Sequence, residues 1–350
     1  MKKMNFLLAI FLVTGAAAFA QNIDYSMIPY RKGNKWGYAD VNRNIRITPR
    51  YDDAQWFSEG LAAVKVGSKW GYINTDGKMV IPARYTVAKS FRKGYMPDPK
   101  KSGGDSILFA GASKTASGYE QCITTRGIVL PKCPAINENS VAENRIPVAA
   151  VTRTKTYTLP NNNGLFDKVV DDYKIPGNDE TYYIAQKNGL YGVFNSKFET
   201  ILPFEYSSVQ QLKSGNNEYL QVQKNGMYGI FSGNGQQDIS PDYSSLNIIN
   251  AGDNSNYVIL KKDGKTYVKD IANNDIISLG YADITYDANG GFVITDNNNN
   301  RGFYFPDKRM IAPKYSEVHI VNRGSNYLQV KTSSGKVGYI NTAGDEFFVE

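Results

Sequence analysis

Residue types that perform chemistry are sparse in this 350-residue chain, which contains one histidine and two cysteines. His319 stands in "SEVHIVN", where it alternates with Val318 and Ile320 as an exposed strand residue does. A catalytic triad requires a histidine together with an orienting acid and a nucleophile. No G-x-S-x-G sequence is present to supply such a nucleophile. We therefore expect a protein that is not an enzyme and that uses no cofactor.

Acidic and amide side chains gather at several points, but their spacing does not suit a metal site or an acid–base pair. The stretch "DNNNNRG" (296–302) is rich in oxygen ligands, yet a calcium loop requires glycine where this sequence has arginine. No three or four His, Cys or acidic residues cluster as zinc ligands do. Asp52-Asp53 and Asp171-Asp172 are adjacent pairs, and neighbouring strand residues point to opposite faces. The sequence predicts polar turns at these points.

The first twenty residues have the features of a signal peptide. Lys2 and Lys3 precede an apolar stretch (6–13), and Ala18-Phe19-Ala20 matches a signal-peptidase site. The alternative is an uncleaved anchor, but the apolar run is shorter than the ~20 residues that span a bilayer. We expect residues 1–20 to be removed, so that the mature chain begins at Gln21. The protein is then exported, periplasmic or secreted, with no membrane span after cleavage.

Without Lys2 and Lys3 the chain has 38 basic and 33 acidic residues, a net charge of +5. This mild excess does not indicate nucleic acid as a partner. Cys122 and Cys133 flank "ITTRGIVLPK", which reads as a hairpin with its turn near Arg126-Gly127. In an oxidising compartment this pair can close a disulfide if the register allows it. Two buried free thiols are the alternative.

A repeated sequence sets the organisation of the chain. "GNKWGYADVNRNIRITPRY" (33–51) returns as "GSKWGYINTDGKMVIPARY" (67–85), 34 residues later. The glycine of "WG" serves as an anchor, with Tyr267 in its place in one copy and Gln121 and Tyr157 in two degraded copies. The anchor glycines are Gly37, Gly71, Gly192, Gly229, Gly302 and Gly338. A tyrosine follows 13 or 14 residues after an anchor at Tyr51, Tyr85, Tyr206, Tyr243, Tyr281 and Tyr315, and a proline 11 or 12 residues after it at Pro49, Pro82, Pro203, Pro241 and Pro313.

Each repeat of about 36 residues reads as a three-stranded β-meander. In residues 218–243, "YLQVQ" alternates apolar and polar residues as a half-buried strand does. The "NG" that follows is a strong hairpin signal, since both turn positions require a positive φ. "MYGIF" is the second strand and "DISP" the third, which we expect proline to end because it has no N–H to donate.

The repeated aromatic residues are expected to pack in the core and between repeats. One three-stranded unit is too small to bury its own apolar face, whereas stacked units share a core. Trp36, Trp70, Tyr191 and Tyr228 precede anchor glycines, and a glycine there lets another aromatic ring or the backbone approach closely. The alternative is that these aromatics are exposed as a ladder that binds sugars.

The segment "KWGYINTDGKMVIPARY" resembles the repeat of the WG-repeat (KWG) family. The resemblance implies an all-β repeat array and brings no enzymatic activity and no catalytic residues. We expect about nine repeats in an open curved array, because nine exceed the usual four to eight blades of a closed ring. A β-propeller-like ring is the alternative. The expected organisation is residues 1–20 signal peptide, 21–90 repeats one and two, 91–180 an insertion loop with two degenerate repeats, and 181–350 repeats five to nine.

The insertion "FRKGYMPDPKKSGGDS" (91–106) reads as an exposed loop or hairpin tip, and such loops often carry binding residues. A tolerated insertion is the alternative. The function expected from these features is that of an exported, non-enzymatic and monomeric scaffold that binds an envelope protein. The second hypothesis is a glycan- or peptidoglycan-binding module that uses the repeated aromatics.

Overall fold

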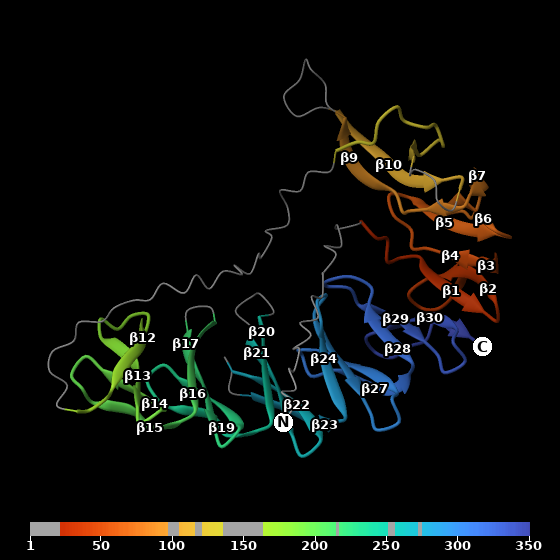
Figure 1. Ribbon diagram of the computed structural model, residues 1–350. Helices are drawn as coiled ribbons and strands as arrows, with labels where there is room; N and C mark the ends of the chain where they lie inside the picture. Colours follow the sequence, from red (N-terminus) through yellow and green to blue (C-terminus); the bar gives the residue numbers. More distant parts are fainter. Residues whose placement is uncertain are drawn as a thin grey trace, which may run out of the picture. The chain divides into compact units, whose positions relative to one another are not determined.

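The computed structural model describes residues 22–96, 105–115, 121–135, 164–214, 217–250, 256–271 and 275–350 (Figure 1). Throughout these residues the regular secondary structure is β-strand, without a helix, so the predicted all-β repeat fold is confirmed. The expected signal peptide, the start at Gln21 and the degraded repeat anchored at Tyr157 lie outside the described residues.

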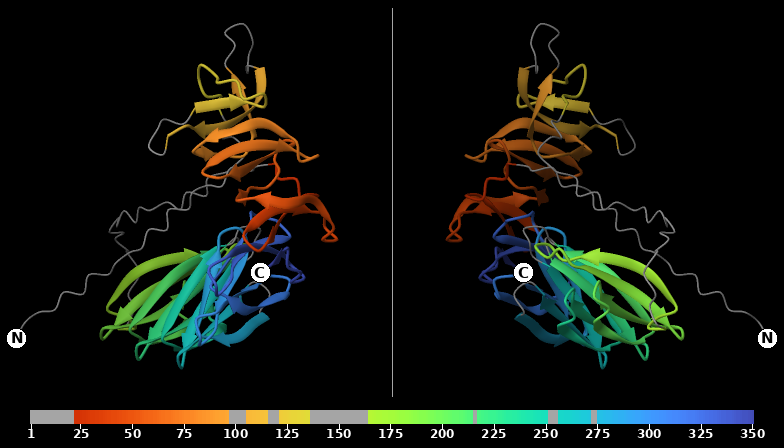
Figure 2. Two further views of the ribbon diagram at one scale, coloured as in Figure 1. Left: turned by 90° about the vertical axis from the view of Figure 1, so that its right-hand side faces the viewer. Right: turned by 90° about the vertical axis from the view of Figure 1, so that its left-hand side faces the viewer.

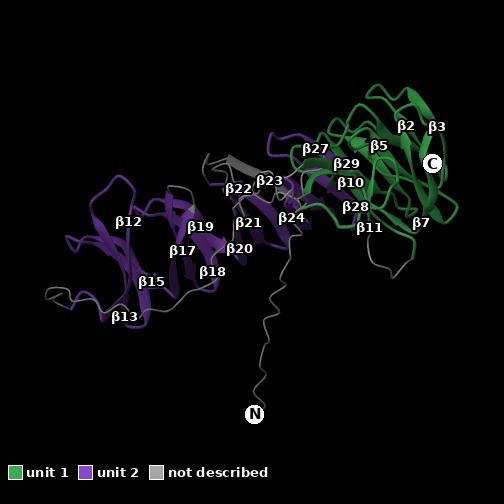
Figure 3. Ribbon diagram, turned by 90° about the horizontal axis from the view of Figure 1, so that it is seen from above, with its two compact units in different colours: residues 1–144, 320–350 green, residues 145–319 purple. Residues whose placement is uncertain are grey.

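The chain forms two compact units, coloured separately in Figure 3. The first comprises residues 1–144 and 320–350, and the second residues 145–319. The first unit therefore combines repeats from both ends of the chain.

Four sheets lie in the first unit, and neighbouring strands within them are mostly antiparallel. The strands are β1 (Ile28–Lys32), β2 (Lys35–Ala39), β3 (Ile45–Tyr51), β4 (Asp53–Ala54), β5 (Leu61–Val66), β6 (Lys69–Asn74), β7 (Met79–Tyr85), β8 (Val87–Ala88), β9 (Arg92–Met96), β10 (Asp105–Ser113), β11 (Gln121–Thr124), β29 (Tyr327–Lys331), β30 (Val337–Asn341) and β31 (Phe348–Val349). Their orders are β3-β2-β1-β31, β4-β5-β6-β7 and β11-β10-β8 with β9 beside β10, and β29 pairs with β30.

In the second unit, four sheets of four strands each follow the order of the sequence. The strands are β12 (Lys168–Lys174), β13 (Thr181–Lys187), β14 (Leu190–Asn195), β15 (Thr200–Tyr206), β16 (Ser208–Ser214), β17 (Asn217–Lys224), β18 (Met227–Ser232), β19 (Gln237–Tyr243), β20 (Ser245–Asn250), β21 (Asn256–Lys262), β22 (Lys265–Asp270), β23 (Asp275–Tyr281), β24 (Asp283–Asp287), β25 (Gly291–Thr295), β26 (Arg301–Tyr304) and β27 (Met310–Tyr315), followed by β28 (Glu317–Ile320).

The three predicted strands of a repeat are joined by a fourth, which was not predicted as a full strand. It begins directly after the repeated tyrosine: β4 follows Tyr51, β16 follows Tyr206 and β24 follows Tyr281. Each of these strands pairs antiparallel with the next strand in the chain. The tyrosine therefore marks the point where one sheet ends and the next begins.

The predicted hairpin turns are confirmed by their backbone angles. Asn188-Gly189, Asn225-Gly226 and Asp263-Gly264 have positive φ at both positions, as type I′ turns require. The second turn of the repeat has a signal that the sequence analysis missed, an Asp or Asn three residues after the anchor. Oδ1 of Asp40 accepts hydrogen bonds from the backbone N–H groups of residues 42 and 44, and Oδ1 of Asn341 accepts those of 343 and 345. Such side-chain bonds stabilise turns locally.

Inner strands such as β5 are buried on both faces, whereas outer strands such as β7 alternate between buried and exposed residues. In β5, Ala62 and Val64 belong to a core shared with the first repeat, whereas Leu61 and Ala63 face a second core shared with β10. Since successive residues of a strand point to opposite faces, one strand contributes to two cores. The sheet that contains β5 therefore has a core on each side.

The two ends of the described chain meet inside the first unit (Figure 2). The C-terminal strand β31 pairs in parallel with β1, where Arg31 lies opposite Phe348. Phe347 donates its N–H to the carbonyl of Tyr339 at 2.8 Å and accepts the N–H of Arg31 at 3.1 Å. The last repeat thus continues directly into the first sheet.

The insertion is a β-hairpin whose strands extend further than expected. β9 pairs with β10 from Arg92 opposite Phe109 to Met96 opposite Asp105, and residues 97–104 lie outside the described residues. A Cβ on Gly94 would lie 2.5 Å from the ring of Phe109, so this strand is closely packed. Residues 94–96 and 105 are therefore not part of the loop.

Replacing residues 97–104 with a short Gly-Ser turn should leave the melting temperature nearly unchanged, because loop closure depends only weakly on length, about 0.6 kcal/mol per doubling. Replacing 94–105 is the matched control and should destabilise the first unit, since it removes paired strand residues. Differential scanning calorimetry measures both. Equal melting temperatures for the two variants would contradict the packed hairpin.

Candidate functional site

The repeated aromatic residues are partners across two neighbouring strands. The residue before the anchor glycine lies opposite the repeated tyrosine in the pairs Trp36–Tyr51, Trp70–Tyr85, Tyr191–Tyr206 and Tyr228–Tyr243. Trp36, Tyr51, Tyr85, Tyr206 and Tyr315 are buried, and Trp70, Tyr191, Tyr228, Tyr243 and Tyr281 are partly buried. None of them is among the exposed large apolar residues of the described chain. These aromatics pack the repeats rather than form an exposed ladder.

The anchor glycine lies where the third strand bulges over the second. Trp70 pairs with Tyr85 and Tyr72 with Ile81, so residues 82–84 face Gly71 alone. A Cβ on Gly71 would lie 2.6 Å from the carbonyl oxygen of Ile81, and one on Gly229 would lie 2.7 Å from that of Ile239. The backbone similarly crowds Gly37, Gly192 and Gly302, and the ring of Phe348 crowds Gly338.

The repeated proline lies inside this bulge. The prediction that proline ends the third strand is wrong, because β7 continues through Pro82 to Tyr85 and β19 continues through Pro241 to Tyr243. The bulge suits proline, because its residues leave the regular ladder and require no N–H donor there. Where Tyr267 replaces the anchor glycine, Gly280 lies in the bulge with φ +57°, so the glycine has moved to the other strand.

Two further side chains connect each early repeat to the next. The tyrosine after the anchor donates its hydroxyl to the following repeat, from Tyr38 to the carbonyl of Gln55 at 2.7 Å and from Tyr72 to that of Lys89 at 2.8 Å. Arg50 donates to the carbonyl of Gly77 at 2.8 Å. These roles were not predicted, although the "GY" and "RY" pairs recur visibly in the sequence.

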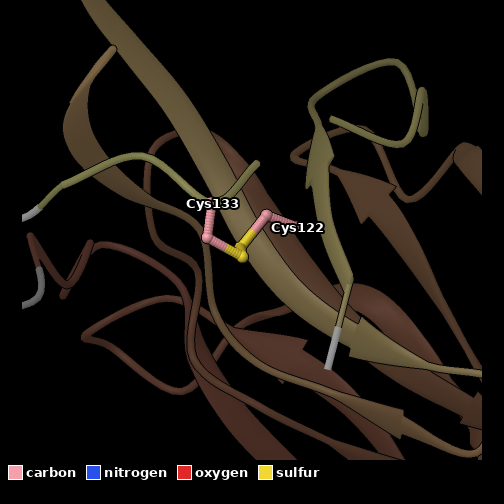
Figure 4. The surroundings of a disulfide bond; sticks show 2 residues. All are labelled: Cys122 and Cys133. Carbon is pink, nitrogen blue, oxygen red and sulfur yellow. A yellow bond between two sulfur atoms is a disulfide. The ribbon is translucent and has the colours of Figure 1, made fainter. Parts of the chain in front are cut away.

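Cys122 and Cys133 form the expected disulfide, with their Cα atoms 5.2 Å apart (Figure 4). Cys122 lies on β11, and the backbone N–H of Leu130 donates to its carbonyl at 2.7 Å. The turn contains Gly127 with φ +75°, as the hairpin prediction required. His319 lies exposed on β28, as expected.

One cleft of about 380 Å³ lies in the first unit, at the junction of the first and last repeats. The β1–β2 hairpin, the start of β4 and the β29–β30 hairpin form its walls. The polar and aromatic side chains that line it include Arg31, Trp36, Asp53, Gln329, Lys336 and Tyr339. Asp52, which directly precedes β4, is also among the lining residues.

Arg31 is the buried cation of the cleft, with 3% of its surface exposed. Its Nε donates to the carbonyl of Val337 at 2.6 Å and its Nη1 to that of Gly33 at 2.6 Å. The guanidinium lies 5.3 Å from the ring centre of Phe348. Nη2 is buried without a hydrogen-bond partner. Burial lowers the pKa of Arg31 while the charge of Glu350 opposes the shift, and a guanidinium remains protonated in proteins.

The two carboxylates differ in their surroundings. Asp52 accepts hydrogen bonds from Nζ of Lys35 at 2.5 Å and from the N–H of Gly67 at 2.7 Å, and the bond from Lys35 lowers its pKa most. Oδ1 of Asp53 accepts the N–H of Ala54 at 2.9 Å. Burial raises the pKa of Asp53, which the neighbouring charge of Lys65 partly opposes. Asp53 makes no ion pair with any residue that the structure describes.

The aromatic wall of the cleft is mostly covered by its neighbours. Trp36 and Tyr339 meet edge to face with ring centres 6.0 Å apart, and they are 7% and 6% exposed. Nε2 of Gln329 donates to the hydroxyl of Tyr339 at 3.2 Å, and burial raises the pKa of that tyrosine to about 12. Trp56, which the sequence analysis did not single out, packs 5.1 Å from Tyr339. The cleft therefore presents mainly polar groups above packed aromatic rings.

Trp36→Ala should lower the free energy of unfolding by about 3–5 kcal/mol, as for other buried Trp truncations. Trp70→Ala should cost less, because Trp70 is only partly buried and lies under the ammonium of Lys65. Urea denaturation gives both values. A loss at position 70 equal to or larger than that at position 36 would contradict the packing described above.

Gly71→Ala should destabilise by at least about 1–3 kcal/mol, because the added methyl group meets backbone atoms that cannot move aside. Gly67→Asn is the control: no atom lies within 4 Å of a Cβ there, and asparagine tolerates its φ of +62°. Thermal unfolding compares them. If the melting temperature of Gly71→Ala equals that of the wild type, the bulge does not require glycine.

Similarity to solved structures is weak. The Dos1 propeller is 12% identical with a TM-score of 0.28, over 94% of this chain and 96% of that one. The computationally designed Ika8 protein is 10% identical with a TM-score of 0.25 over 83% of each chain, and Hsv2 of Kluyveromyces lactis is 8% identical with a TM-score of 0.21 over 81% and 90%. Scores this low carry no argument about this chain. No curated protein matches the sequence.

The family comparison matches the repeats themselves. Residues 36–70, 70–96 and 191–228 match the family model of the WG containing repeat. These stretches include the anchors Gly37, Gly71 and Gly192, at which the third strand crosses over glycine. Three stretches of the chain therefore match the WG containing repeat, the family that the sequence resembles.

Proposed function

We propose that this protein is an exported, non-enzymatic scaffold that binds a protein partner in the cell envelope. The burial of the repeated aromatics supports this proposal most directly. Because those residues pack the cores, the surface left for a partner consists of turns, strand edges and charged side chains. The second candidate, a glycan module that uses an aromatic ladder, lacks the exposed rings that it requires among the described residues.

Export is supported by two independent features. The first twenty residues match a signal peptide in sequence. The Cys122–Cys133 bridge suits an oxidising compartment, since disulfides rarely persist in a reducing cytosol. In the part of the chain that the structure describes, no helix has both the length and the apolar character needed to cross a membrane.

The charge distribution favours the first unit as the binding unit. Without residues 1–20 it holds 21 basic and 14 acidic residues, a net charge of +7, whereas the second unit holds 17 and 19, a net charge of −2. Complementary charge steers partners and selects among them. We therefore propose that the protein acts as a monomer and that its first unit contacts a partner with an acidic surface.

The experiment is capture from envelope extract with the oxidised chain beginning at Gln21. We expect saturable capture of a specific protein that weakens several-fold in the double variant Arg46→Glu/Lys78→Glu, because both cations are exposed on the first unit. The double variant Lys168→Glu/Lys174→Glu carries the same charge change on exposed residues of the second unit and should capture normally. Quantitative mass spectrometry measures recovery.

Capture that is equal for both double variants would contradict the role of the first unit. Recovery of a glycan polymer with no protein partner would favour the second candidate. The variant with residues 97–104 replaced reports on the insertion: loss of capture at unchanged melting temperature assigns the tip to recognition, and full capture assigns the contact to the sheets.

A further inference from the structure

The cleft between the first and last repeats contains both hydrogen-bond donors and hydrogen-bond acceptors that have no partner among the described residues. On the donor side, Nη2 of Arg31 has no hydrogen-bond partner, and Lys336 makes no ion pair with a described residue within 4 Å, although the charge of Glu350 acts on both cations. On the acceptor side, Oδ2 of Asp53 and Oε1 of Gln329 accept no hydrogen bond from the described residues. Arg31 and Asp53 do not form an ion pair with each other across the cleft. Buried or half-buried polar groups left unpaired are costly, so a ligand that pairs them gains affinity.

The mixture of charges excludes simple ligands. An anion would lie near the carboxylates of Asp52 and Asp53, and a cation would lie near Arg31 and Lys336. An apolar ligand would leave all of these groups unpaired. A sugar would require a ring face for stacking, but Trp36 and Tyr339 are almost fully covered. A ligand that carries both an ammonium and a carboxylate avoids each of these conflicts.

We propose that this cleft binds a zwitterionic amino compound, a free α-amino acid or a short peptide. The ammonium group lies toward Asp53 and the carbonyl of Gln329, and the carboxylate lies toward Lys336 and the positive field of Arg31. The volume of about 380 Å³ falls within the roughly 300–1,000 Å³ of small-molecule sites, which leaves room for a dipeptide. This site is separate from the protein partner proposed above, and it exists only where the two chain ends meet.

The experiment is calorimetric titration of the full mature chain with L-alanyl-L-alanine. N-acetyl-L-alanine and L-alaninamide are the matched probes, since the first lacks the ammonium and the second lacks the carboxylate. We expect saturable binding of the dipeptide with a Kd of about 1 mM or tighter, and binding at least about tenfold weaker for each matched probe.

Variants of Asp53 and Lys336 test the ammonium-binding and carboxylate-binding sides of the cleft separately. Asp53→Asn and Lys336→Met should each weaken dipeptide binding about tenfold without changing the melting temperature, because each substitution removes the charge while keeping a side chain of similar length, and neither side chain links strands. Asp283→Asn is the control, since Asp283 stands two residues after a repeated tyrosine as Asp53 does, but pairs with Lys261 at 3.0 Å in the second unit. It should bind normally.

Three results would overturn the proposal: no heat of binding for the dipeptide at about ten times the expected Kd, equal affinity for either matched probe, or equal affinity in Asp53→Asn. The titration tests only the cleft, so a negative titration does not contradict the proposed protein partner. A failed capture experiment tests only the protein partner, so it does not contradict ligand binding in the cleft.

Discussion

A sheet one layer thick has two faces, and both must be covered. Burying one large apolar side chain contributes about 1.5–3 kcal/mol, and a four-stranded sheet of this protein carries several on each face. Within each unit, inner repeats obtain cover from the repeats before and after them in sequence, as β5 does through its alternating residues. No described residues form a repeat before the first one. The first repeat is covered by Tyr327, Tyr339 and Phe347 of the last repeat, whose final strand pairs with β1. The last repeat therefore supplies cover that the first repeat needs within the first unit.

The bulge over the anchor glycine explains why several sequence marks occur in phase. The third strand must pass three residues over one glycine, and this fixes the distance from the aromatic before the anchor to the tyrosine opposite it. Proline fits the bulge and also removes a donor from an outer strand, which protects that edge against pairing with other chains. The exchange of roles between Tyr267 and Gly280 follows from the same crowding, because only one of the two strands needs to lack a side chain there.

Features encoded locally could be predicted from the sequence. The repeat, the Asn-Gly turns, the packing of the aromatics and the Cys122–Cys133 hairpin each depend on residues within one period of about 36. At β4 the fourth strand is two residues long and has no alternation to detect, whereas the equivalent β16 and β20 are seven and six residues long and could have been detected. The capping Asp40 and Asn341 were missed although their position three residues after the anchor was visible in the sequence.

Features that depend on distant residues could not be predicted in this way. Arg31 and Val337 are separated by 306 positions, and no local pattern links them. The cleft arises only when the last repeat packs against the first, so Asp53 and Lys336 each read as an ordinary surface charge in the sequence. The pairing of Asp52 with Lys35 also left Asp53 as the half-buried carboxylate without an ion pair, a difference between neighbours that composition cannot show.

The junction of the chain ends is tested most directly by hydrogen exchange on a chain that lacks residues 347–350. In the intact protein, the amide of Arg31 donates to the carbonyl of Phe347 and that of Gly33 to the carbonyl of Val349. Truncation should expose both amides and accelerate exchange along β1 and β30, while β17 in the second unit keeps its protection. Unchanged protection of β1 in the truncated chain would show that the last repeat does not complete the first.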